Sequence, residues 1–188
     1  MQQQLKELEV KPNKIAFQAA IAFSVYYLLL LYLLKFLNID PMQADMGFAT
    51  KAIIWVLSYV PFVLAIIFVQ NKHKTDLGGY MSFGRGFSAG FKTAAYAGLF
   101  LFILILLYYK VLDPSAMVHM IDVAVEQVGD DEKKIEAVKM MGPYMALFAA
   151  FGIAITYTIF GLIVSLAGAA VLKKELPAGN EPTDFIAS

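Results

Sequence analysis

Residues 86–90 read Gly-Phe-Ser-Ala-Gly and match the G-x-S-x-G pattern of serine hydrolases, with Ser88 as the candidate nucleophile. That chemistry needs a strained turn between a strand and a helix, and a histidine and a carboxylate beside the serine. Here the motif opens a long apolar segment instead. The only histidines, His73 and His119, are predicted on opposite sides of a membrane, outside its apolar segments. The motif is therefore better explained by small residues that pack helices, and we expect no catalytic residue.

The stretch around Arg85 also combines glycines with a basic side chain, which suggests phosphate binding. Its glycine spacing, however, fits neither the dinucleotide-binding nor the P-loop pattern. Aromatic residues recur at intervals of four, and Arg85 and Lys92 can extend along an apolar surface toward lipid headgroups. These residues predict an interfacial helix that anchors the following span, with a specific anionic-lipid or protein contact as the functional variant. The predicted anchor comprises Phe83, Arg85, Phe87, Phe91 and Lys92.

No metal or cofactor site is expected. The acidic run of residues 130–132 lacks the alternating ligands and the turn glycine of a dedicated calcium loop, and acids at the start of a helix explain it more simply. The chain has no cysteine, which removes thiolate zinc sites, iron–sulfur ligation and disulfides. Fifteen basic and fifteen acidic residues give zero net charge, so no overall field favours nucleic acid as a partner.

The composition is that of a membrane protein. Sixty per cent of the 188 residues are hydrophobic and 16% are charged, whereas soluble domains average about 45–50% and about 25%. Four segments are long and apolar enough to cross a bilayer, which needs roughly 20 residues. We therefore predict an all-α membrane protein with four transmembrane helices in a single domain, residues 1–174. The predicted spans cover residues 15–34, 52–69, 88–109 and 144–172.

The largest segment between the spans is residues 110–141, which we expect to form an outer helical loop. Asp113 can cap a first helix whose apolar residues recur at helical spacing, and Asp130 or Asp131 can cap a second, short helix. Two amphipathic helices on the outer membrane boundary, or over the mouth of the bundle, are the expected result. Residues 175–188 contain two prolines and few apolar residues, and we expect a flexible cytoplasmic tail.

The distribution of Lys and Arg predicts the orientation. The side with both termini and the loop between the second and third spans carries nine basic residues, and the other side carries six. Because basic residues accumulate in cytoplasmic loops, both termini are predicted to be cytoplasmic.

Ladders of small residues indicate where helices meet, since helices in lipid associate where their backbones can approach closely. We expect internal helix–helix contacts, with a homodimer face as the alternative. Pro61 removes one backbone hydrogen bond in the second span and should kink it. The ladders are Gly86, Gly90, Ala94 and Gly98 in the third span and Gly161, Ser165 and Ala169 in the fourth.

Residues 81–91 (MSFGRGFSAGF) and 126–144 (EQVGDDEKKIEAVKMMGPY), together with the order of the spans, resemble the domain-of-unknown-function 4199 family. These are small integral membrane proteins of Gram-negative bacteria. The resemblance covers essentially the whole chain. It implies a multi-pass protein of the bacterial inner membrane with no assigned activity, and it transfers no catalytic residue.

Three functions remain open. The first is a non-enzymatic interaction or accessory subunit that pairs through the glycine ladder, as a homo-oligomer or with another membrane protein, and presents its outer loop to a partner. Leucine at Gly90 or Gly98 should then remove co-purifying proteins.

The second function is a small-solute or lipid-handling transporter built by an oligomer around a cavity near Tyr59, Pro61 and Thr156. No ionisable residue lies near the centre of any predicted span, which disfavours ion-coupled transport. The third is the hydrolase based on Ser88.

Overall fold

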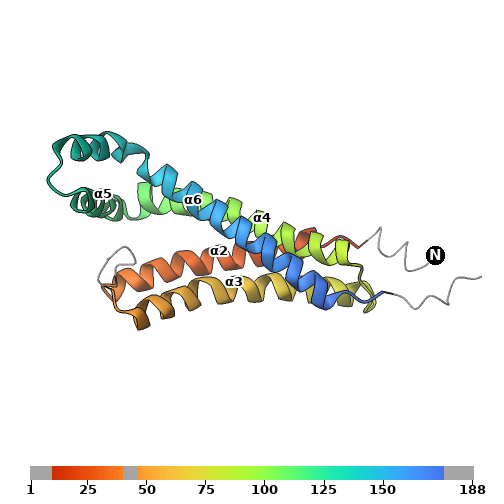
Figure 1. Ribbon diagram of the computed structural model, residues 1–188. Coiled ribbons are helices and arrows are strands. Elements are labelled where there is room, and N and C mark those ends of the chain that lie inside the picture. The colour runs from red at the N-terminus through yellow and green to blue at the C-terminus, as the bar shows by residue number, and fades with distance from the viewer. Residues whose placement is uncertain (1–9, 40–45, 176–188) are drawn as a thin grey trace, which may run out of the picture.

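A computed structural model describes residues 10–39 and 46–175, and this part of the chain is helical apart from short turns. Four of its helices are long and apolar enough to cross a membrane. They lie side by side as a bundle (Figure 1). The predicted all-α fold with four apolar spans is confirmed, whereas the predicted tail lies outside the described residues beyond position 175. The four helices are α2 (Asn13–Phe36), α3 (Phe48–Asp76), α4 (Phe83–Leu107) and α6 (Glu132–Leu172).

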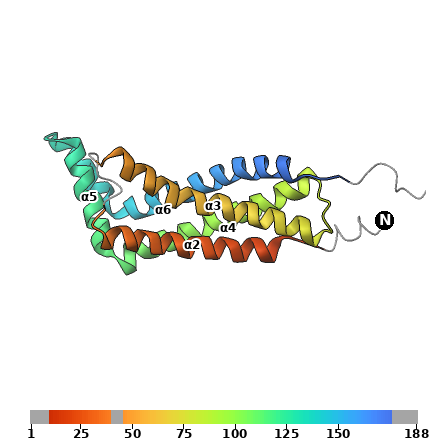
Figure 2. The ribbon, with the colours of Figure 1, turned by 90° about the horizontal axis from the view of Figure 1, so that it is seen from below.

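A helical hairpin connects α4 to α6. The chain leaves α4 through one π-helical segment, η1 (Tyr108–Leu112), and continues into α5 (Pro114–Val128). Figure 2 shows α5 lying across one end of the bundle. We call this end the hairpin end, and the opposite end, where α2 begins and α6 finishes, the terminal end. The hairpin consists of α5 and the part of α6 that precedes Pro143.

Helix α6 is longer than the sequence suggested. Instead of a short loop helix followed by a separate span from residue 144, one helix of 41 residues runs through Gly142 and Pro143. Gly142 is buried where α5 crosses, and a Cβ there would lie 3.1 Å from Cδ1 of Ile121. Gly142 is therefore a packing site inside a helix, and Gly142 and Pro143 do not mark a helix boundary. Pro61 likewise lies inside α3, which is helical from Phe48 to Asp76.

At the terminal end, a tight turn joins α3 to α4. Gly78 and Gly79 have φ angles of 83° and 90°, which side chains rarely tolerate. Met81 then exchanges two backbone hydrogen bonds with Lys174, each 2.9 Å long. These bonds tie the turn to the end of α6.

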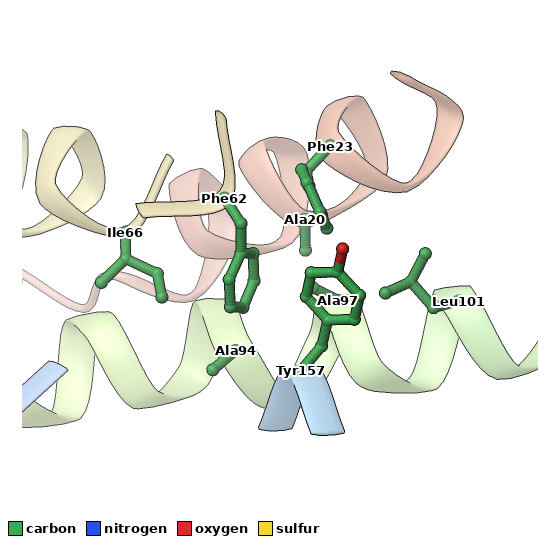
Figure 3. Close-up of a cluster of buried hydrophobic side chains, with 8 residues drawn as sticks. All are labelled: Ala20, Phe23, Phe62, Ile66, Ala94, Ala97, Leu101 and Tyr157. Carbon is green, nitrogen blue, oxygen red and sulfur yellow. The ribbon is translucent and has the colours of Figure 1, made fainter. Parts of the chain in front are cut away.

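The core centres on α4, which packs against α2, α3 and α6. Figure 3 shows aromatic rings from the other three helices gathered over the small side chains of α4, including Ala94 and Ala97. The ring centroid of Phe62 lies 4.8 Å from that of Phe23 and 5.1 Å from that of Tyr157. Small residues on α4 thus leave the volume that three large rings fill.

Candidate functional site

The two ladders of small residues face each other between α4 and α6. A Cβ on Gly86 would lie 3.3 Å from the Cα of Ala169, and one on Gly90 would lie 2.9 Å from the Cβ of Ser165. Ala94 is directly opposite Gly161, and Gly98 faces the carbonyl of Ala154 at 3.1 Å and the Thr158 side chain. In the described chain these residues are covered by the neighbouring helix of the same bundle.

Gln70 of α3 is completely buried between these helices. Its Nε2 donates to the carbonyl of Gly86 at 3.0 Å and to the carbonyl of Ser165 at 2.9 Å, so one amide joins three helices. Its Oε1 has no hydrogen-bond partner and lies against Gly168. The glycines of α4 and α6 therefore also make room for a polar clamp. One turn further along α3, His73 is buried with Nε2 unpartnered.

The predicted anchor residues occupy the first turns of α4. Phe87 and Phe91 stack with their centroids 5.6 Å apart, and Lys92 donates a hydrogen bond of 2.8 Å to Oδ1 of Asn13. Phe83 is exposed and Arg85 is half-buried. Lys92 thus fastens α4 to the start of α2, while a role for the group in lipid anchoring stays a prediction.

At the hairpin end, α3 and α6 separate and enclose a cleft of about 480 Å³. Its base is a pair of stacked rings, Tyr59 of α3 and Tyr157 of α6, with centroids 5.3 Å apart. The Tyr157 hydroxyl donates to the Ser58 carbonyl at 3.1 Å, which fixes this ring across the gap. Thr156 also lines the cleft, as does Tyr59, whereas Pro61 does not. We call this space the α3–α6 cleft.

A second cavity of about 460 Å³ adjoins the first, with Tyr27 and Ile153 lining both. It extends from α2 to η1 and α5, and Lys35 and Asp113 are among the residues that line it. There Lys35 of α2 forms an ion pair with the buried carboxylate of Asp113, which also accepts hydrogen bonds from Ser115 and, at 3.1 Å, from Tyr108. This cluster ties the end of α2 to the start of the hairpin.

The surroundings of Asp113 favour its charged form. Burial raises the pKa of this carboxyl, but hydrogen bonds from Lys35, Ser115 and Tyr108 outweigh burial and hold the pKa at about 2, below its ordinary value of 3.8. Asp113 precedes α5 as the sequence suggested, with Pro114 in the first turn, yet its side chain makes no capping bond. At the next helix Asp131 does cap α6, because its carboxylate accepts from the Lys134 amide at 3.3 Å.

In the described part of the chain, no histidine and carboxylate are placed beside Ser88 as the serine hydrolase hypothesis requires. Ser88 is half-buried in α4, and no hydrogen bond joins it to His73 or His119. Residues 10–39 and 46–175 also contain no group of three histidine, aspartate or glutamate side chains that could hold a metal ion.

Two features of the site escaped the sequence reasoning. Gln70 stands just beyond the predicted second span, and its polarity at that position was the available signal. The pairing of Lys35 with Asp113 has no local signal, because the two residues are 78 positions apart.

Comparison with known proteins identifies the family. The family model described as protein of unknown function (DUF4199) matches residues 18–174, and the chain belongs to this family. The match includes the hairpin and most of all four apolar helices. Among curated proteins and solved structures, none matches the chain.

Proposed function

We propose that this family member is a non-enzymatic accessory subunit of the bacterial inner membrane that binds a membrane-protein partner through its hairpin. One observation carries the proposal. Two antiparallel membrane helices need a connection of only about 2–8 residues, but the chain places a helical hairpin between α4 and α6. Loops held at a defined position by a rigid scaffold commonly carry function.

The surface of the hairpin suits a polar contact. Some of its apolar residues face inward, since Met120 is buried and Ile121 packs on Gly142 of α6, whereas Val118 and Met140 are exposed. Asp122, Glu126 and Gln127 of α5 are exposed. Residues 114–141 contain six acids and three lysines, a net charge of −3. We therefore expect a partner with a basic contact surface.

Recovery of a partner in mild detergent, followed by mass spectrometry, tests this proposal. We expect one protein to co-purify in constant ratio with the wild type and to fall at least fivefold when Asp122 and Glu126 are both replaced by lysine. The matched control is Asp76→Lys, an exposed charge reversal at the terminal end. Equal recovery from all three proteins, or no protein in constant ratio, contradicts the proposal. Leucine at Gly90 or Gly98 is a poorer test, because it would disrupt contacts within the bundle itself.

We further propose that both termini are cytoplasmic, on the strength of the nine-to-six distribution of basic residues. The absence of cysteine makes single-cysteine labelling clean. With a membrane-impermeant maleimide, Asp130→Cys should react in cells with a permeabilised outer membrane. Asn71→Cys, which is exposed at the terminal end, should react only after the inner membrane is opened. The reverse pattern would refute this orientation.

A second candidate function is an oligomeric transporter of small solutes or lipids. The observation in its favour is the α3–α6 cleft, which two residues of the sequence-based hypothesis, Tyr59 and Thr156, line together. Flux assays in reconstituted vesicles test this function. Flux equal to that of empty vesicles for every solute and lipid tried would count against it.

A further inference from the structure

The buried face of α3 becomes polar at the terminal end. Ile66 and Val69 are completely buried, and the next buried positions along this helix are Gln70 and His73. His73 is 1% exposed, and its Nε2 has no hydrogen-bond partner among the described residues. It stands one turn beyond the Gln70 clamp and just past the predicted second span. A titratable side chain is therefore enclosed at the edge of the membrane, next to the contact that joins three helices.

The groups around His73 oppose a positive charge on its ring. Burial and the cations Arg85 and Lys92 of α4 hold the pKa of His73 below its ordinary value of 6.5, although Asp76 acts in the opposite direction. Asp76 is exposed and paired with Lys72 at 3.0 Å. The other charged side chains described near the helix ends that meet here (Figure 2) are mostly basic: Lys11 and Lys14 near the start of α2, Lys74 of α3, and Lys173, Lys174 and Glu175 after α6.

A proton on His73 conflicts with the packing of the structure, which we call the closed state. A buried imidazolium loses its hydration, and an N–H without a partner adds to this cost. Water has little room to enter, because a Cβ on Gly86 would lie 3.3 Å from the Cα of Ala169 and one on Gly90 would lie 2.7 Å from Nε2 of Gln70. Hydration of the charged ring therefore requires the helices to move apart. In such an open state the ring takes up a proton at about pH 6.5.

We propose that His73 is a proton-sensitive switch, which lets α3, α4 and α6 close at the terminal end when it is neutral and opens them there when it is protonated. The sign follows from linkage. Because the open state binds the proton more readily, the closed state has its full stability above about pH 6.5 and loses stability as the pH falls below that value. The switch lies at the opposite end from the hairpin surface of the proposed function, and either can fail without the other.

Hydrogen exchange measured by mass spectrometry tests the proposal. The purified protein in lipid nanodiscs is labelled at pH 7.5 and at pH 5.5, with labelling times scaled for the intrinsic rate of amide exchange. We expect the amides of residues 68–76 and 86–93 to open about three- to tenfold more at pH 5.5, where about tenfold is the limit for one histidine that titrates only in the open state. Residues 51–59, at the other end of α3, should change less than about twofold. Equal opening at both pH values, or an equal rise at both ends of α3, would overturn the switch.

The chain contains two histidines, which gives a matched pair of variants. His73→Gln keeps a polar side chain that does not titrate in this range and should abolish the pH difference, whereas His119→Gln, at an exposed position, should retain it. A pH difference that persists in His73→Gln, or that His119→Gln also abolishes, refutes the assignment to His73.

A second pair of variants tests the surrounding charge even if His73→Gln does not fold. Arg85→Gln removes the cation of α4 with the larger effect on His73 and should reduce the pH difference to about half, because the closed state then accepts the proton more readily. The matched control is Lys133→Gln, an exposed cation of the hairpin, which should leave the difference unchanged. The same pH difference in Arg85→Gln and in the wild type would contradict the switch as described.

Discussion

The close approach of α4 and α6 at Gly90 makes alanine there destabilising, although alanine is the better helix former. A Cβ on residue 90 would lie 2.9 Å from the Cβ of Ser165 and 2.7 Å from both Oγ of Ser165 and Nε2 of Gln70. Carbon atoms pack at about 3.5–4.0 Å, so the helices must separate by roughly 0.6–1.1 Å to relieve the contact with the Cβ of Ser165. Nε2 of Gln70 must move as well, which strains its two hydrogen bonds. The Cβ of Ser165 is fixed by its backbone and cannot rotate away.

The expected magnitude combines two terms of opposite sign. Overpacking costs about 1–3 kcal/mol, and replacing a helical glycine by alanine returns about 0.5–1 kcal/mol. Gly90→Ala should therefore lower the free energy of unfolding by about 1 kcal/mol, and by at most about 2.5 kcal/mol. Gly152→Ala on α6 meets nothing within 4 Å and should raise it by about 0.5–1 kcal/mol.

Unfolding in mixed micelles of mild detergent and SDS, followed by circular dichroism, measures both changes. The double variant Gly90→Ala with Ser165→Gly removes the fixed Cβ and should recover part of the loss, as a favourable coupling of about 1 kcal/mol in a double-mutant cycle. If Gly90→Ala is as stable as Gly152→Ala, or if Ser165→Gly gives no coupling, the described contact between α4 and α6 is wrong.

Two further predictions concern buried polar groups. Asp113→Asn should cost about 2 kcal/mol at pH 7 in the same unfolding assay. Because the pKa of Asp113 is lowered in the folded state, the difference in free energy of unfolding between this variant and the wild type should persist above pH 4 and vanish as the pH falls through about 2. The control variant Asp122→Asn, at an exposed position, should stay within about 0.5 kcal/mol of the wild type. Gln70→Met should change the free energy of unfolding by less than about 1 kcal/mol, because it removes two hydrogen bonds and an unpartnered Oε1 together, whereas Gln70→Ala leaves a cavity and should cost about 2 kcal/mol or more. Equal stability of these two variants would contradict the role of Gln70 as a space-filling clamp.

The spans could be predicted because bilayer thickness acts on each segment alone. A run of about 20 apolar residues signals a span whatever its neighbours, and all four predicted spans lie inside long helices. The ends of the helices were harder to predict from the sequence. Pro143 suggests a boundary by its local preference, but tertiary packing of Ile121 on Gly142 favours one continuous helix. This preference for a long helix depends on α5, which no window around residue 143 contains.

The features of the candidate site depend on pairs of distant residues, which explains why composition and spacing missed most of them. The stacking of Tyr59 on Tyr157 joins two helices across almost a hundred positions, and so does the bond from Gln70 to Ser165. A small residue in a ladder indicates that a neighbouring group approaches closely, but it does not identify that group. At Gly90 the neighbours include a buried amide from a third helix, a contact that the four-residue repeat of α4 does not encode.

The two ends of the bundle differ in the cost of separating their helices or admitting a ligand. Toward the terminal end, α3, α4 and α6 meet through glycines and the Gln70 clamp, so separating them breaks hydrogen bonds and close backbone contacts at once. Toward the hairpin end, Tyr59 and Tyr157 hold α3 and α6 apart, and the space beyond them is about 480 Å³. A ligand that fills this space adds contacts without removing any, whereas a ligand at the terminal end would have to displace packed side chains. The hairpin end, where the α3–α6 cleft and the hairpin both lie, therefore offers space in which a ligand binds at low cost.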